Sequence, residues 1–290
     1  QQYQFKGGNL KRWQKKLRTK LKELMGFEIP SKKIPLNVKK IWKKNTGLGT
    51  IEKIVFTSQP YADIPAYVCV PCEFRKPRAW MICLQGHSTG MHNSIAVTFE
   101  DENIPKEIAG DRDFGIGCIK RGIGAICIEQ RAFGERKELK QKNKSDHTCH
   151  DASMQALMLG TTLMAERVYD VERTLDYLET RNDVDKKMIG VMGNSGGGTI
   201  SVFSGALLPR ISFMMPSCYF CTFKDSIMSV FHCADNYVPG LLKYAEMSDI
   251  LGLFAPKPVV IVVGKDDEIF PIEGSKRSFT ALKKIYKSAG

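Results

Sequence analysis

Short, solidly apolar segments alternate with amphipathic stretches along most of the chain. The strand-like segments are residues 51–57, 65–70, 80–84, 124–129, 187–192, 212–216 and 258–263. The helix-like stretches between and after them are residues 111–121, 153–180, 198–206 and 275–288. Apolar strands that alternate with helices are typical of a mostly parallel sheet with helices on both faces. The pattern therefore predicts an α/β fold.

The first fifty residues differ from the rest. Apolar residues recur at three- and four-residue steps over residues 9–25, and Gly26 follows, which predicts an amphipathic helix whose leucines pack against its own domain. We divide the chain into a basic N-terminal helical extension, residues 1–50, and an α/β domain, residues 51–290. Within that domain, the aromatic-rich residues 217–253 are expected to form a cap segment over a pocket.

Charge is concentrated in the same N-terminal segment. The 290 residues carry a net charge of +12, and residues 1–50 alone hold 14 basic and two acidic side chains, a net of +12. A solvated basic face is the favoured interpretation, and binding to nucleic acid or to an anionic membrane is the alternative. With 43% hydrophobic and 26% charged residues, the chain has the composition of a globular protein rather than a disordered one.

The sequence predicts no membrane span, no signal peptide and no metal site. The longest aliphatic run, residues 259–263, is far shorter than the ~20 residues of a membrane span. The nine cysteines are interpreted as free thiols in a reducing, cytoplasmic compartment. Two C-x-x-C pairs, Cys69 with Cys72 and Cys218 with Cys221, resemble halves of a zinc site. They lie far apart and beside strands, so zinc is not expected.

Residues 193–197 (GNSGG) place a G-x-S-x-G motif directly between a strand and a helix. A nucleophilic serine needs a strained turn there, so that its hydroxyl projects above the sheet, and small neighbours let strand and helix approach closely. The free amides and the positive dipole end of the helix favour a developing oxyanion. Ser195 is therefore the candidate nucleophile. A phosphate-binding loop is disfavoured because no G-x-G-x-x-G register or Lys-Ser/Thr pair is present.

The residues after the predicted strand at 80–84 are expected to complete an oxyanion hole. Gln85, Gly86 and His87 come after the strand at 80–84, which supplies the second oxyanion amide in such a sheet. We expect the backbone N–H of His87 to pair with that of Gly196. This backbone role for His87 is favoured over catalysis by its imidazole.

The acid that orients a catalytic histidine belongs after the last predicted strand, where Asp266 and Asp267 compete for the role. Either could instead be only a turn residue. In chain order a histidine should come next, but none follows Asp267. The histidines of the chain are His87, His92, His147, His150 and His232.

Together these motifs resemble the α/β-hydrolases of the dienelactone-hydrolase-like group, in particular the acetyl xylan esterase branch. The matching segments are residues 84–87 (LQGH), 129–131 (EQR), 134–136 (GER), 193–198 (GNSGGG), 216–219 (PSCY) and 267–271 (DEIFP). The resemblance implies an α/β-hydrolase fold, Ser195 as nucleophile, Asp267 as the acid, and acetylated carbohydrate as substrate. It also implies a further strand and a Gly-His segment after Asp267, which are missing from this sequence.

The sequence thus predicts a serine carboxylic-ester hydrolase that needs no metal or organic cofactor and takes a small-molecule or carbohydrate ester. Its catalytic histidine is expected beyond residue 290, with His232 or His150 as less favoured internal substitutes, and the 290 residues alone are expected to be a poor esterase. The alternatives are a non-catalytic binding protein on a hydrolase fold and a nucleic-acid or membrane binder that uses the basic arm. The sequence leaves the oligomeric state open, a homo-oligomer included.

Overall fold

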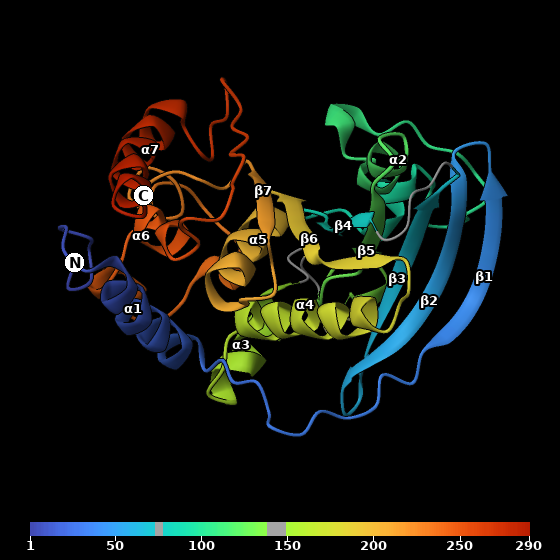
Figure 1. The fold of residues 1–290 in the computed structure, drawn as a ribbon, viewed down its shortest axis with the longest axis horizontal. Coiled ribbons are helices and arrows are strands. Elements are labelled where there is room, and N and C mark those ends of the chain that lie inside the picture. Colours follow the sequence, from blue (N-terminus) through green and yellow to red (C-terminus); the bar gives the residue numbers. More distant parts are fainter. Residues whose placement is uncertain (73–77, 138–148) are drawn as a thin grey trace.

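Seven strands form one mixed sheet in the order β1-β2-β3-β5-β4-β6-β7 (Figure 1). The structure is a computed structural model that describes residues 1–72, 78–137 and 149–290. The strands are β1 (Lys39–Thr46), β2 (Gly49–Gln59), β3 (Ala62–Pro71), β4 (Arg78–Leu84), β5 (Gly124–Ile128), β6 (Val184–Asn194) and β7 (Phe213–Ser217). The first three form an antiparallel meander, β3 pairs antiparallel with β5, and β4 to β7 run parallel. The carboxyl ends of the parallel strands therefore share one edge, where the site residues predicted from the sequence lie.

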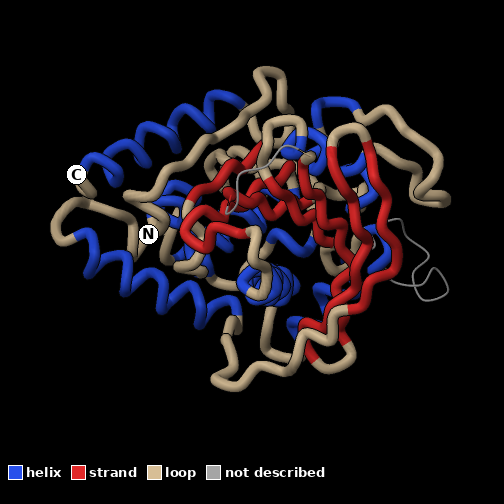
Figure 2. The backbone as a smooth tube through the Cα atoms, turned by 45° about the vertical axis from the view of Figure 1, so that its right-hand side comes forward, coloured by secondary structure: helices blue, strands red, loops and turns tan. Residues whose placement is uncertain are grey.

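Helices cover both faces of this sheet (Figure 2). They are α1 (Leu10–Met25), α2 (Phe114–Ile119), α3 (Cys149–Met158), α4 (Leu163–Glu179), α5 (Gly196–Leu207), α6 (Met247–Gly252) and α7 (Ile272–Lys287). The helix predicted over 153–180 is divided in two: Gly160 has a positive φ of 77°, and the Thr162 side chain caps α4 by accepting from the N–H of Ala165. Within the described residues, no helix is long and apolar enough to cross a membrane.

The two edges of the sheet differ from the prediction. β1 was not predicted, because its eight residues are half lysine and show little apolar alternation, yet it pairs with β2 along its length. At the other edge, the strand predicted over 258–263 is present only as isolated bridges, Val259 to Met214 and Val262 to Ser217. The other predicted strands are confirmed, with bounds that differ by a few residues.

Alternation along the buried strands divides the interior into two cores. In β4, Ile82 and Leu84 face the large core, whereas Met81 and Cys83 face the smaller one. The large core also includes residues from α1, α4 and α5, and the smaller core includes residues from α2. This period of two is what a sheet covered on both faces requires, and it turns uniformly apolar strand sequences into two distinct surfaces.

The leucine stripe of α1 packs into the large core, as expected. Leu17, Leu21 and Met25 are fully buried, and the lysines of the helix face outward. The helix begins at Asn9, whose side chain accepts from the N–H of Arg12, and ends at Gly26 in the left-handed conformation. The basic segment is thus tied to the α/β domain through a conventional apolar face.

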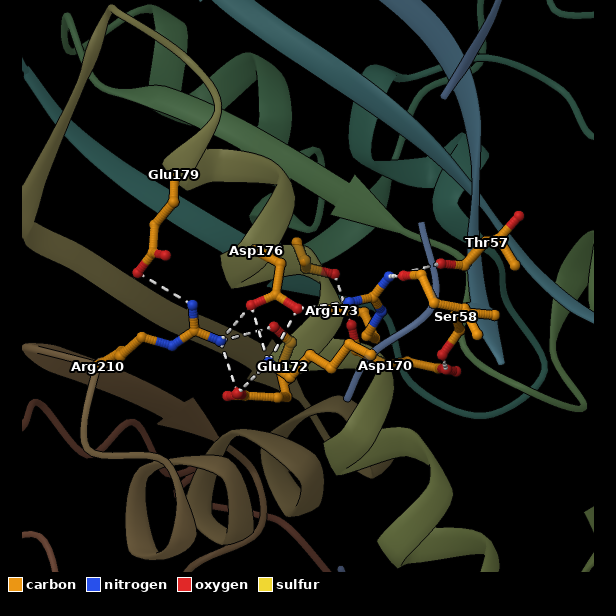
Figure 3. Close-up of polar contacts among 11 residues, drawn as sticks. Thr57, Ser58, Asp170, Glu172, Arg173, Asp176, Glu179 and Arg210 are labelled. Carbon is orange, nitrogen blue, oxygen red and sulfur yellow. Dashed lines mark hydrogen bonds and ion pairs between the residues drawn. The ribbon is translucent and has the colours of Figure 1, made fainter. Parts of the chain in front are cut away.

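An ion-pair network fixes α4 against its surroundings (Figure 3). The Arg210 guanidinium contacts Glu172 at 2.7 Å, Asp176 at 2.8 Å and Glu179 at 3.0 Å. On the other side of the helix, Ser58 of β2 donates to Asp170 at 2.6 Å. A network of charges that share partners is more stabilising than isolated surface pairs. These contacts tie α4 to β2 and to the segment that precedes β7.

Candidate active site

The backbone of Ser195 has the strain that a nucleophile elbow requires. β6 ends at Asn194 and α5 begins at Gly196, so Ser195 alone makes the turn, with φ 52° and ψ −115°. Its N–H donates to the carbonyl of Ser217 at 2.9 Å, which ties the turn to β7. A non-glycine residue in this region costs roughly 1–3 kcal/mol and persists only when its surroundings enforce it. The strain predicted from the G-x-S-x-G spacing is present.

The glycines around the elbow are needed for space. A Cβ atom on Gly197 would lie 2.1 Å from the carbonyl oxygen of Leu84, and one on Gly193 would lie 2.5 Å from the carbonyl group of Gly197. On the opposite side, a Cβ on Gly86 would lie 3.2 Å from the Cβ of Ser195. Strand, turn and helix therefore meet at contact distance, and the loop after β4 runs directly beside the serine.

The His87 side chain extends from this loop across the start of α5. A Cβ on Gly196 would lie 2.8 Å from both Cε1 and Nδ1 of the His87 ring. The other ring nitrogen, Nε2, lies 3.0 Å from both carboxylate oxygens of Asp235. The ring also packs edge-on against Phe133, with centroids 5.0 Å apart. The imidazole of His87 thus lies beside Gly196.

A buried ion pair sets the charge of that imidazole. Asp235 is 4% exposed and pairs with Arg167, which is 2% exposed and donates also to the carbonyl of Arg131. Burial is the largest single influence and would lower the pKa of His87. The hydrogen bond that the ring donates to Asp235, the nearby Cys149 thiol and the charge of Asp235 together outweigh it and raise the pKa to about 9. Burial would raise the pKa of Asp235, but Arg167 and His87 hold it well below its usual range. Near neutral pH the site therefore contains an imidazolium, a carboxylate and a guanidinium.

Sequence reasoning did not identify Asp235 or Arg167. Arg167 lies within α4 and Asp235 in a short 3-10 turn, Ala234–Asn236, 68 residues later in the chain. Neither belongs to a spaced motif. The one available signal was the position of Asp235 inside the aromatic segment 217–253, which was already expected to border a pocket.

Of the two histidines considered as internal substitutes, His232 packs beside His87, and His150 lines the same cavity as His232. The His232 ring centroid is 6.5 Å from that of His87 and 5.9 Å from that of Phe270. Burial, followed by the nearby charge of His87, lowers the pKa of His232 to about 4. Its Nδ1 is 3.1 Å from the side-chain nitrogen of Asn236. His150 is exposed on α3 beside its neighbour in sequence. His147 lies outside the described residues.

Asp267 and Asp266 occupy the loop before α7. One carboxylate oxygen of Asp267 accepts from the N–H groups of Ile269 and Phe270, both at 2.9 Å, whereas Asp266 is exposed. Asp267 thereby shapes the turn itself. In the described part of the chain it has no hydrogen bond to a histidine, and the loop approaches the other site residues through Phe270.

A buried carboxylate holds the loop after β4 in place. Glu129, just after β5, accepts from the N–H of Met91 and from the N–H of Glu135, both at 3.1 Å. Burial raises the pKa of Glu129 to about 7 despite these two hydrogen bonds. Gln130 adds a hydrogen bond to the carbonyl of Gln85 at 2.5 Å. These residues belong to the matching segment 129–131, and they connect the loop that carries His87 to the loop after β5.

A cavity of about 860 Å³ opens beside the histidines. Its lining is mostly apolar and comes chiefly from the segment 217–253. Representative lining residues are Phe223, Ile227, Met228, Phe231, His232 and Asn236. A cavity of this size and polarity suits a hydrophobic group of a small molecule.

The described residues contain one gathering of metal-ligating side chains, and it was not among the expected ones. His87, Cys149, Cys233 and Asp235 each offer one ligand atom, and these atoms lie within 4.8 Å of one another. The cysteines of the two C-x-x-C pairs are free thiols outside this group.

Comparisons with known proteins agree with this architecture. The sequence profile of the Abhydrolase family matches residues 2–279. A Bacillus subtilis (strain 168) protein named as the hydrolase YtaP is 24% identical over 277 residues, which cover 94% of this chain and 88% of that protein. A Bacteroides fragilis NCTC 9343 structure described as an acetyl xylan esterase superposes with a TM-score of 0.80 at 20% identity, covering 99% of this chain and 75% of the other. A glucuronoyl esterase from Solibacter usitatus gives 0.71 at 15% identity, covering 97% and 82%.

Proposed function

The chain belongs to the Abhydrolase family, and on that premise we propose that it is a serine carboxylic-ester hydrolase that acts through an acyl-enzyme. One observation carries the proposal: Ser195 is held at φ 52° on the tight turn between β6 and α5, with the His87 loop beside it. A strained serine at that place has no structural use that a glycine would not serve better. The names of relatives, a hydrolase and two esterases, support the same class of reaction.

In the proposed reaction, the Ser195 hydroxyl attacks the ester carbonyl while a base removes its proton. The resulting oxyanion is held by the N–H groups of His87 and Gly196 and by the positive end of α5. Collapse expels the alcohol, which takes the proton from the base, and water then hydrolyses the acyl-enzyme.

Asp267 is proposed as the acid that orients the histidine base. Within the described residues, His232 is the candidate for that base, because its ring packs against Phe270, on the same loop as Asp267, and burial keeps it unprotonated at neutral pH. Its pKa of about 4 also makes it a weak proton acceptor. His87 is the poorer base, because its ring is protonated at neutral pH. The His232→Ala variant separates these cases: loss of turnover with a retained fold assigns the base to His232, and retained turnover excludes it.

The substrate is proposed to be a small-molecule or carbohydrate ester, and acetylated carbohydrate is the class that the names of structural neighbours suggest. The apolar cavity that reaches His232 supplies space for the hydrophobic part of such an ester. A p-nitrophenyl ester series from acetate to octanoate tests this role, because a longer acyl chain gains binding only if the cavity receives it.

The proposal is tested by hydrolysis of p-nitrophenyl acetate. We expect Ser195→Ala to leave the fold intact and to abolish turnover, since loss of the nucleophile in one serine protease costs roughly a million-fold. Ser201→Ala is the matched control, because Ser201 lies on the same helix and its hydroxyl donates to the carbonyl of Gly197. Activity of the folded Ser195→Ala variant equal to that of Ser201→Ala would remove the assignment.

A further inference from the structure

We propose that His87, Cys149, Cys233 and Asp235 form a binding site for one divalent cation of the zinc class. Two thiols, an imidazole and a carboxylate are the donors that tetrahedral zinc prefers. The four groups come from three separate segments, namely the loop after β4, the start of α3 and the segment around the 3-10 turn at Ala234–Asn236. Nothing in the proposed ester hydrolysis uses either cysteine.

The spacing of the donor atoms suits such an ion after a small contraction. All four lie within 4.8 Å of one another, whereas donors around tetrahedral zinc are separated by roughly 3.3–3.8 Å. The widest pair therefore has to close by about 1 Å. The Nε2 atom of His87 and a carboxylate oxygen of Asp235 are already 3.0 Å apart, and the Cys149 thiol lies within 4.8 Å of both His87 and Cys233.

Burial and charge favour the same conclusion. Cys149 and Asp235 are buried, and His87 and Cys233 are partly buried, so few water molecules compete for the ion. Two thiolates and the Asp235 carboxylate carry three negative charges. The dication and the Arg167 guanidinium, which pairs with Asp235, carry three positive charges. The loaded site is neutral, as a buried cluster needs to be, and Arg167 orients the carboxylate from outside the coordination shell.

Four protein ligands leave no open position, which is typical of a structural rather than a catalytic zinc site. Binding would join the His87 loop to α3 and to the segment at 233–235. Because the ion binds only the folded arrangement, metal uptake is expected to stabilise the fold and to fix the loop whose backbone forms the proposed oxyanion hole.

The test uses the full 290-residue chain, stripped with a chelator, fully reduced and with its free thiols counted. Cobalt(II) is titrated first, because tetrahedral thiolate coordination gives visible d–d bands and a sulfur-to-cobalt charge-transfer band. We expect one cobalt per chain, its displacement by zinc, and a rise in melting temperature on zinc addition. Zinc should also protect Cys149 and Cys233 from alkylation, while the exposed Cys72 stays reactive in the same sample.

Cys149→Ser and Cys233→Ser should each weaken cobalt binding at least tenfold and remove the charge-transfer band. The matched controls Cys118→Ser, a buried thiol, and Cys72→Ser, an exposed one, should bind as the unmodified chain does. No binding by the reduced chain, or equal affinity in the Cys149 and Cys233 variants, overturns the site. If either variant fails to fold, the alkylation pattern of the unmodified chain decides: loss of protection at Cys149 and Cys233 contradicts the proposal. All these readouts are independent of esterase activity.

Discussion

Replacing Glu129 with glutamine should change how stability depends on pH. Glu129 is 1% exposed, and burial raises its pKa from 4.5 to about 7. The folded chain therefore holds a proton on this group between those pH values, and the unfolded chain does not. For a carboxyl group whose pKa is raised on folding, stability is highest below the unfolded pKa and falls as pH rises to the folded pKa. Above pH 7 the loss is complete and constant.

The size of this loss follows from the two pKa values. One pKa unit corresponds to about 1.4 kcal/mol, so the interval from 4.5 to about 7 corresponds to roughly 3 kcal/mol of unfolding free energy. Glutamine cannot ionise, so Glu129→Gln loses this dependence. Its amide has one acceptor oxygen, so one of the N–H groups of Met91 and Glu135 loses its partner, at a cost of about 1–3 kcal/mol that is independent of pH.

The assay is urea unfolding of both proteins at several pH values from 4.5 to 8. At each pH, the unfolding free energy of Glu129→Gln is subtracted from that of the unmodified chain, so the contributions of the other titrating groups cancel. This difference should fall by roughly 3 kcal/mol as the pH rises over this interval. Glu107→Gln, at an exposed position, is the matched control and should show a nearly constant difference. A constant difference for Glu129→Gln as well would show that Glu129 is ionised throughout, and would refute the argument from burial.

Three further predictions concern the elbow and the acid. The free energy of unfolding in urea should be about 1–3 kcal/mol higher for Ser195→Gly than for Ser195→Ala, because glycine adopts a φ of 52° without strain. Equal stability of the two variants would mean that the turn is unstrained. Asp267→Asn should lower turnover of p-nitrophenyl acetate far more than Asp266→Asn, and the reverse order would transfer the catalytic role to Asp266. Gly197→Ala should destabilise the fold by more than about 3 kcal/mol or prevent folding, since its Cβ would lie 2.1 Å from the Leu84 carbonyl oxygen; near-normal circular dichroism melting would contradict this packing.

The strand-turn-helix around Ser195 could be predicted from sequence because its causes are local. Glycine spacing, an apolar strand and a helical stretch follow one another directly between residues 187 and 206, and each constrains the same backbone. Uniformly apolar strands likewise predicted the sheet, since only a sheet covered on both faces buries consecutive apolar residues. By contrast, β1 exists because its backbone bonds to β2, and lysine side chains carry little signal for that pairing.

The charged part of the site could not be predicted for a related reason. His87, Arg167 and Asp235 meet through tertiary packing across 148 residues of sequence, and buried charges follow no periodicity. The same holds for Cys149 and Cys233, which contact each other only because α3 packs beside the 3-10 turn at Ala234–Asn236. Composition did draw attention to the segment 217–253, whose aromatic and aliphatic side chains line the cavity.

Covalent labelling of the native chain by a fluorophosphonate, with the modified residue located by mass spectrometry, tests the central claim most directly. The reagent phosphonylates a serine only when an adjacent base and an oxyanion hole activate it. The proposed function predicts a single adduct on Ser195, absent from the Ser195→Ala variant, from heat-denatured protein and, if His232 is the base, from His232→Ala. An adduct on another serine, or none on the folded native chain, would contradict the proposal that Ser195 is an activated nucleophile.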